Sequence, residues 1–151
     1  MNQRVLKFLS GTDEIWHAGD IGDYGIWKKL SSLKPLKAVH GNIDGPDIRS
    51  ECPEFMVFTV EDVKVLMLHI GGSPGRYDRR AGALILKERP DLFVSGHSHI
   101  LKVMYDQKFS LLHINPGAAG NFGFHTSLTA VRFTIDGKNI KDLEVLDISR
   151  K

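Results

Sequence analysis

The segment LFVSGHSH, residues 92–99, decides how the rest of the sequence is interpreted. Its first three residues, Leu92 to Val94, are apolar and typical of a short buried strand, which Ser95-Gly96 brings to an end. His97 and His99 follow at a spacing of two, and residues two apart in an extended segment point the same way. Two imidazoles placed in this manner commonly share a metal cluster. The segment therefore predicts a strand whose carboxyl end carries metal-binding chemistry.

On both sides of this segment, hydrophobic periodicity predicts alternating helices and strands followed by antiparallel hairpins. The predicted helices cover residues 4–9, 24–33 and 80–89, and the strands that alternate with them cover 14–18, 36–39 and 92–94. Predicted hairpins pair 55–60 with 63–68, fold within 103–114, and fold within 129–148 around the Asp136-Gly137 turn. No linker or internal repeat divides the chain, so we expect one α/β (α+β) domain over residues 1–151.

The predicted strands of the β/α part end at side chains that can bind a metal ion, each close to a glycine. These side chains are Asp20 after Gly19, Asn42 after Gly41, His69 before Gly71, and His97 with His99 after Gly96. Each has a plainer interpretation when taken singly, because Gly-Asp and Gly-Asn favour turns and a lone histidine is often packed. Carboxyl ends of strands in an open α/β sheet meet at one edge, however, so the set can converge. Oxygen and imidazole donors suit Mn²⁺, Zn²⁺ or Fe ions.

Composition and charge exclude several other classes of protein. A content of 42% hydrophobic and 25% charged residues is typical of a globular domain and argues against disorder. A net charge of +2 is too small to indicate a specific nucleic-acid partner or an anionic membrane. The single cysteine, Cys52, allows no internal disulfide and no thiolate pair for a metal. Since no secretory or membrane-spanning segment is evident either, we expect a cytoplasmic protein.

An ordered set of motifs gives the sequence a family resemblance. The set is Gly19-Asp20, Gly41-Asn42-Ile43-Asp44, His69, Gly96-His97-Ser98-His99 and Asn115-Pro116-Gly117. It resembles the calcineurin-like metallophosphoesterases, specifically their small phosphodiesterase branch. The resemblance implies a sandwich of two β-sheets flanked by helices, with two divalent ions in one cleft. Mn²⁺ is the ion that the resemblance favours, and Zn²⁺, Fe or Ni²⁺ are alternatives.

The same resemblance implies roles for individual residues. Asp20 would bridge both ions; Asn42, His69 and His97 would complete the second site, and His99 would belong to the first. A hydroxide bridging the metals would attack phosphorus in a phosphodiester or phosphomonoester of a small molecule. The residues implied to contact the phosphate are Asn115, the backbone of Gly117 and, as a weaker candidate, His125. All three have structural alternatives, because Asn115-Pro116-Gly117 also favours a turn and His125 is compatible with a plain loop.

The sequence departs from the family pattern at two points. Members of the family begin with a buried strand that ends in Asp-x-His, and no Asp-x-His occurs in this chain. The resemblance therefore leads us to expect that the first strand is missing, that the first metal site is incomplete and that strand edges are left open. Self-association into a homo-oligomer is one expected way of covering such edges. Ile43 stands where some relatives place a histidine general acid, so the group that protonates the leaving group is unassigned.

Two functions follow from these observations, an enzyme and a scaffold. Retention of the five metal-ligand residues favours a phosphoesterase, whereas the absence of Asp-x-His favours a non-catalytic protein-interaction scaffold on the same fold. The remaining histidines, His17, His40 and His113, lie in or beside apolar runs and are expected to be packed or hydrogen-bonded. Arg76, Arg79 and Arg80 could meet a phosphate, although a solvated charged loop is the plainer interpretation.

Overall fold

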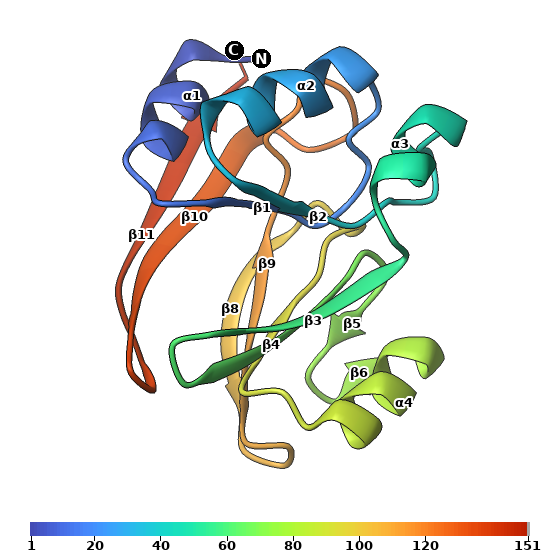
Figure 1. Ribbon diagram of the computed structural model, residues 1–151, viewed down its shortest axis with the longest axis vertical. Helices are drawn as coiled ribbons and strands as arrows, with labels where there is room; N and C mark the ends of the chain where they lie inside the picture. Colours follow the sequence, from blue (N-terminus) through green and yellow to red (C-terminus); the bar gives the residue numbers. More distant parts are fainter. Residues whose placement is uncertain (151) are drawn as a thin grey trace.

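The structure, a computed structural model, describes residues 1–150 and consists of one larger sheet, three small sheets and four helices (Figure 1). The elements are α1 Gln3–Ser10, β1 Ile15–His17, α2 Tyr24–Leu33, β2 Leu36–Ala38, α3 Pro46–Glu51, β3 Phe55–Val60, β4 Val63–Leu68, β5 Gly72–Ser73, β6 Arg76–Tyr77, α4 Arg79–Glu88, β7 Leu92–Val94, β8 Leu101–Asp106, β9 Leu111–Pro116, β10 Ser127–Asp136 and β11 Asn139–Ser149. Among the described residues, none of these helices is long and apolar enough to cross a bilayer.

The larger sheet has five strands in the order β3-β4-β7-β9-β8. Its three central strands, β4, β7 and β9, are parallel to one another, and the edge strands β3 and β8 are antiparallel to their neighbours. Successive side chains of a strand point to opposite faces, so β4 serves two cores. Val65 and Met67 pack toward β10 and β11, while Leu66 and Leu68 pack against α4. Burial on both faces explains why residues 65–68 of β4 are a continuous apolar run.

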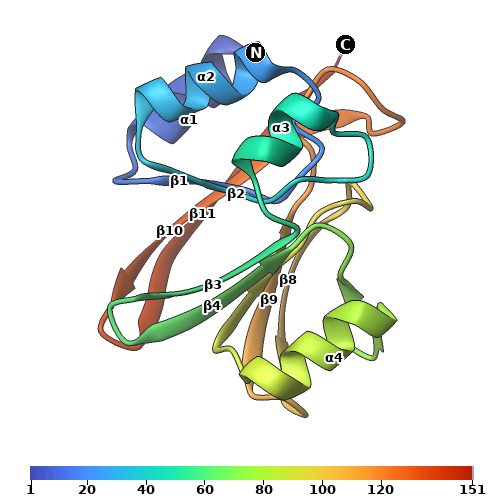
Figure 2. The same cartoon turned by 45° about the vertical axis from the view of Figure 1, so that its right-hand side comes forward.

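The N-terminal layer is built on a separate sheet of two parallel strands, β1 and β2, in which Ile15 pairs with Leu36. The helices α1, α2 and α3 lie on the side of this sheet that faces away from the five-stranded sheet (Figure 2). Ala38 of β2 packs with Ile48 of α3 in a small apolar cluster, which the aromatic rings of α2 border. This layer carries the loops that follow β1 and β2.

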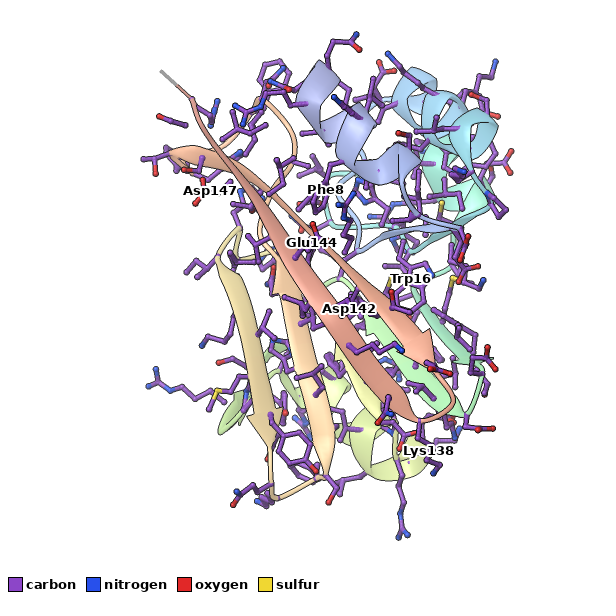
Figure 3. All side chains as sticks on the ribbon, turned by 90° about the vertical axis from the view of Figure 1, so that its left-hand side faces the viewer. Phe8, Trp16, Lys138, Asp142, Glu144 and Asp147 are labelled. Atoms are coloured by element: carbon purple, nitrogen blue, oxygen red, sulfur yellow. The ribbon has the colours of Figure 1, made fainter. Side chains whose placement is uncertain are left out.

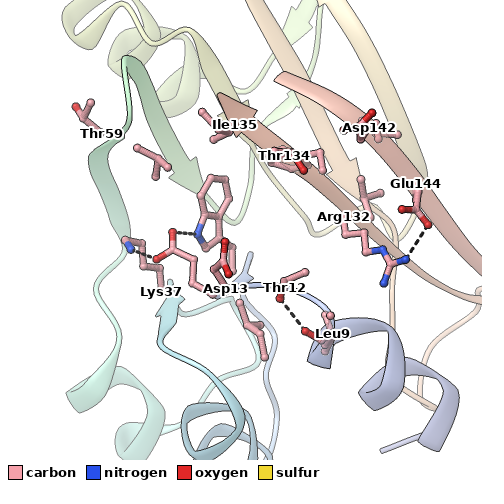
Figure 4. A pocket seen from close by; sticks show the side chains of 18 residues that line it. Leu9, Thr12, Asp13, Lys37, Thr59, Arg132, Thr134, Ile135, Asp142 and Glu144 are labelled. Carbon is pink, nitrogen blue, oxygen red and sulfur yellow. Dashed lines mark hydrogen bonds and ion pairs between the residues drawn. The ribbon is translucent and has the colours of Figure 1, made fainter. Parts of the chain in front are cut away.

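The C-terminal strands β10 and β11 form a long antiparallel hairpin that runs diagonally across the molecule (Figure 3). Its register shifts between Arg132 and Thr134. Among the described residues β10 pairs only with β11 and β1 pairs only with β2, so each has one edge without a strand partner. A groove of about 1190 Å³ lies between β1 and β10 (Figure 4). Inside this β1–β10 groove the Trp16 ring meets Phe133 edge-on, at a centroid distance of 5.7 Å.

Most of the predicted elements are confirmed. The helix 24–33 and the hairpin of 55–60 with 63–68 have the predicted bounds, and a mixed α/β fold with helices on the sheets is present. The helix α3 and the short hairpin of β5 and β6 were not predicted. α3 has only six residues and a glycine N-cap that makes no side-chain hydrogen bond, so Pro46 at its start is its main signal. Such a short segment shows no helical periodicity.

Candidate metal centre

Four loops meet at one edge of the molecule, and each follows a strand. Asp20 comes three residues after the end of β1, Asn42 four residues after β2, His69 directly after β4 and His97 three residues after β7. The neighbouring glycines allow the loops to approach one another. A Cβ atom on Gly19, whose φ is +97°, would lie 2.5 Å from the Nδ1 atom of His69. Any side chain at this position would displace the imidazole, so glycine is required there.

The four side chains form a compact cluster of nitrogen and oxygen donors. The Nε2 atom of His69 lies 2.9 Å from Asn42 Oδ1 and 3.2 Å from Asp20 Oδ2. The Nδ1 atom of His97 lies 3.0 Å from the same Asn42 oxygen. One ligand atom each from Asp20, His69 and His97 lies within 4.8 Å of the other two. The structure therefore brings Asp20, Asn42, His69 and His97 together, as the resemblance implied.

The orientation of His69 favours a cation at the centre of this cluster. Its Nδ1 atom lies 2.7 Å from the carbonyl oxygen of Ala18, which can only accept a hydrogen bond, so Nδ1 carries the proton. Nε2 then faces the oxygens of Asn42 and Asp20, which are themselves acceptors. A bound cation removes this repulsion. A carbonyl that receives the second ring N–H is also the usual orienting partner of a metal-binding histidine.

The donor set fits the ions predicted from the sequence. Two imidazoles, one carboxylate and one amide oxygen, with no thiolate, suit Mn²⁺, Zn²⁺ or Fe better than Cu(I) or an iron–sulfur cluster. Asp20 and His97 hold left-handed backbone conformations, with φ values of 56° and 67°. Such conformations cost free energy and commonly occur at ligand-binding sites. The residues that would hold an ion here are Asp20, Asn42, His69 and His97.

Asp44 stabilises this cluster by binding two of its loops. Its side chain is 4% exposed and accepts hydrogen bonds from the backbone N–H groups of Gly22, at 2.8 Å, and Gly41, at 2.7 Å. These two glycines belong to the loops that carry Asp20 and Asn42, so one carboxylate fixes both loops. The sequence placed Asp44 inside the Gly-Asn-Ile-Asp motif without giving it a role. The contact with Gly22 spans 22 residues and cannot be inferred from local spacing.

A second histidine pair lies beside the cluster. The rings of His99 and His125 meet edge-on at a centroid distance of 5.1 Å, and burial, followed by the nearby His125, lowers the pKa of His99. The extended conformation assumed for residues 97–99 is wrong, because His97 and His99 both have positive φ, 67° and 60°. His99 is not among the residues whose ligand atoms all lie within 4.8 Å of one another. Its assignment to a first metal site stays a prediction.

The candidate phosphate contacts have structural duties of their own. The amide of Asn115 is 3% exposed; its Nδ2 donates to the carbonyl of Gly96 at 2.9 Å and its Oδ1 accepts from the N–H of Gly117 at 3.0 Å. Asn115 thus ties the loop that carries His97 to the end of β9. Gly117 has a φ of +77°. The Nε2 of His125 lies 2.8 Å from the carbonyl oxygen of Gly120.

The histidines expected to be packed differ in their surroundings. Burial lowers the pKa of His17 to about 4, so its ring is neutral and Nδ1 accepts the N–H of Gly19 at 3.2 Å. His113 is fully buried and stacks on Phe93 with ring centroids 5.4 Å apart. Burial, with a smaller contribution from Lys102, lowers the pKa of His113 to about 4. Packing is confirmed for His113, but among residues 1–150 neither of its ring nitrogens has a hydrogen-bond partner.

Comparison with known proteins gives consistent matches. A family model described as the calcineurin-like phosphoesterase superfamily domain matches residues 1–138. A probable metallophosphoesterase from Methanocaldococcus jannaschii is 32% identical over 115 residues, which are 76% of this chain and 57% of that protein. The chain thus spans little more than half the length of this relative.

Solved structures share the fold at low sequence identity. Vps29 from Chaetomium thermophilum superposes with a TM-score of 0.72 at 17% identity, covering 99% of this chain and 90% of that one. A structure described as a novel archaeal phosphodiesterase superposes with a TM-score of 0.70 at 18% identity, covering 95% and 90%. At these identities the likeness concerns the fold alone.

Proposed function

Because this chain belongs to the calcineurin-like phosphoesterase superfamily, we propose that it acts as a metal-dependent hydrolase of phosphodiesters in small molecules. The single observation that carries the proposal is the orientation of His69. Its ring is held by the Ala18 carbonyl so that Nε2 faces the oxygens of Asn42 and Asp20, an arrangement that a divalent cation stabilises. We propose Mn²⁺ as this cation, held by Asp20, Asn42, His69 and His97.

The residues of the chain would act mainly by holding and orienting. When bound, divalent ions neutralise charge on phosphoryl oxygens and lower the pKa of an attacking water. The N–H of Ile43 orients the Asp20 side chain by donating a hydrogen bond to Oδ1 at 3.2 Å. Asp44 holds the loops of Asp20 and Asn42 in register, and Asn115 does the same for the loop of His97. Together these contacts preorganise the donors before substrate binds.

The loop position after Asn42 offers no proton to a leaving group, which favours esters with a good leaving group. Ile43 follows Asn42 and is 65% exposed, so an apolar side chain occupies the loop position next to the donors. A good leaving group such as an aryloxide departs without protonation, whereas an alkoxide needs a general acid in a diester as in a monoester. Aryl phosphodiesters are therefore the reporters best suited to the proposed substrate class.

The experiment that tests this function measures metal content and hydrolysis of bis(p-nitrophenyl) phosphate with added Mn²⁺. We expect Asp20→Asn to lower kcat/KM by more than about 100-fold, since losing a direct ligand exceeds the effect of losing a residue that orients one. Asp47→Asn, on the exposed start of α3, is the matched control and should leave the rate unchanged. No retained metal together with no hydrolysis would contradict the proposal and favour the scaffold.

A further inference from the structure

A second cavity, distinct from the β1–β10 groove, adjoins the candidate metal centre at His97. Its volume is about 410 Å³, and we call it the side cleft. It lies between the β5–β6 hairpin and the strands β8 and β9, and residues that define it are Ile70, Arg76, His97, Ile100, Lys102 and His113. His97 belongs to both sites, so the side cleft opens directly beside the candidate metal centre. A molecule bound at the metal centre could extend one of its substituents into the side cleft.

The lining of the side cleft contains an unused hydrogen-bonding group. His113 is fully buried, and its two ring nitrogens lack a hydrogen-bond partner among residues 1–150. A buried polar group without a partner is costly, commonly by about 1–3 kcal/mol, and calls for an explanation. Its neutral imidazole can donate one hydrogen bond to a group bound in the cleft. His113 thus leaves an unused hydrogen-bonding group beside the side cleft.

The charge of the lining identifies the kind of ligand. Arg76 and Lys102 line the side cleft, and neither forms an ion pair within the described part of the chain. The acidic residue of the lining, Asp78, is already engaged as the N-cap of α4, where its Oδ2 accepts from the N–H of Arg80 at 3.1 Å. Two available cations against one engaged carboxylate favour an anion. Arginine in particular matches the oxygens of a phosphate.

We propose that the side cleft is a second anion subsite, which receives a phosphate carried by one substituent of the substrate. This proposal rests on the proposed function. If the chain hydrolyses phosphodiesters, its preferred substrates are phosphodiesters that bear a further phosphate group. The metal centre would hold the ester to be cleaved, Arg76 and Lys102 would contact the additional phosphate, and His113 would donate to it. Ile70 and Ile100, which are 39% and 63% exposed, offer apolar surface to the organic part that joins the two phosphates.

A binding experiment without metal tests the subsite independently of catalysis. Inorganic phosphate is titrated into the EDTA-treated protein, and the imidazole resonances of His113 and the amide of Lys102 are followed by NMR. We expect saturable shifts, with the dissociation constant raised about fivefold by Arg76→Gln and by Lys102→Gln, since each removes one charge-assisted contact. Arg79→Gln, an exposed cation outside the cleft, is the control and should change binding less than twofold. Absence of saturable shifts, or equal affinity in all variants, would overturn the proposal.

A kinetic experiment then separates the subsite from the proposed function. Two matched substrates are compared in the presence of Mn²⁺, the p-nitrophenyl ester of thymidine 5′-phosphate and the same ester with a further phosphate on the 3′-hydroxyl. We expect the second to have a kcat/KM about tenfold higher, and the double variant Arg76→Gln/Lys102→Gln to remove that advantage. Equal rates for the two esters would reject the subsite while leaving the hydrolase intact. Hydrolysis of neither, with phosphate still bound in the cleft, would reject the hydrolase alone.

Discussion

The five-stranded sheet and the β1–β10 groove differ in how fully their strands are supported. Strands β4, β7 and β9 each have a partner on both sides and a core on both faces, whereas β1 and β10 each pair on one side only. The candidate metal centre is built from residues of both regions. His69 and His97 extend from the well-supported strands, and Asp20 and Asn42 extend from the two-stranded sheet. Half of the donors therefore depend on the weaker part of the fold.

The largest difference between the two regions is expected in core packing. Phe93 on β7 is fully buried, so Phe93→Ala should lower the free energy of unfolding by about 3–5 kcal/mol. Phe133 on β10 borders the β1–β10 groove and is only partly buried, so Phe133→Ala should cost less than about 2 kcal/mol. Urea unfolding followed by circular dichroism measures both. Equal losses would show that the groove region is as tightly packed as the sheet.

Acid should lower the free energy of unfolding by protonating His113, which lies on β9 of the five-stranded sheet. In the folded state its pKa is about 4, against 6.5 in an unfolded chain, so between these values the unfolded state binds more protons. The contribution of neutral His113 to the free energy of unfolding is therefore fully present above pH 6.5. As the pH falls toward 4, this free energy decreases by roughly 3 kcal/mol. We expect His113→Phe to flatten the profile of unfolding free energy over this range. His17 has the same shift and will leave a residual slope.

A profile in His113→Phe as steep as that of the parent protein would assign the acid sensitivity elsewhere. The matched control is Lys102→Gln, because Lys102 makes a smaller contribution to the same pKa shift. Its removal should move the profile only slightly.

Sequence reasoning succeeded where local signals decide the structure. The helix at Tyr24–Leu33 and the β3–β4 hairpin follow from period and turn residues, and the proximity of Asp20, Asn42 and His69 follows from their places at strand ends beside glycines. It could not predict that β1–β2 and β10–β11 are separate sheets, since pairing between distant strands leaves no local signal. The conformation of this segment was missed because His97 and His99 are both left-handed, which few residues other than glycine are, so the extended segment that the spacing suggested does not form.

The support of the weaker region by Asp44 gives a prediction of intermediate size. Asp44→Ala leaves the N–H groups of Gly22 and Gly41 without their acceptor, which should lower the unfolding free energy by about 1–3 kcal/mol. It should also weaken Mn²⁺ binding by about 10–100-fold, because the loops of Asp20 and Asn42 lose their common anchor. Calorimetric titration with Mn²⁺ measures the second effect. Asp62→Asn, on the β3–β4 turn, is a matched control far from these loops, and a similar loss of affinity there would contradict the assigned role.

The smallest effect is expected where α1 meets β10 across the end of the groove. Arg132 donates to the carbonyl of Phe8 at 3.2 Å, lies over the Phe8 ring and pairs with Glu144 at 2.8 Å. Its side chain is 31% exposed and that of Glu144 is 57% exposed, so the ion pair itself is worth less than about 1 kcal/mol. Glu144→Gln should therefore barely change stability, whereas Arg132→Gln should cost slightly more because it also loses the contacts with Phe8. Thermal unfolding at low and high salt distinguishes charge from packing as the source of any loss of stability. A loss of stability in Arg132→Gln that depends on salt would mean that the charge of Arg132, and not its packing on α1, stabilises this contact.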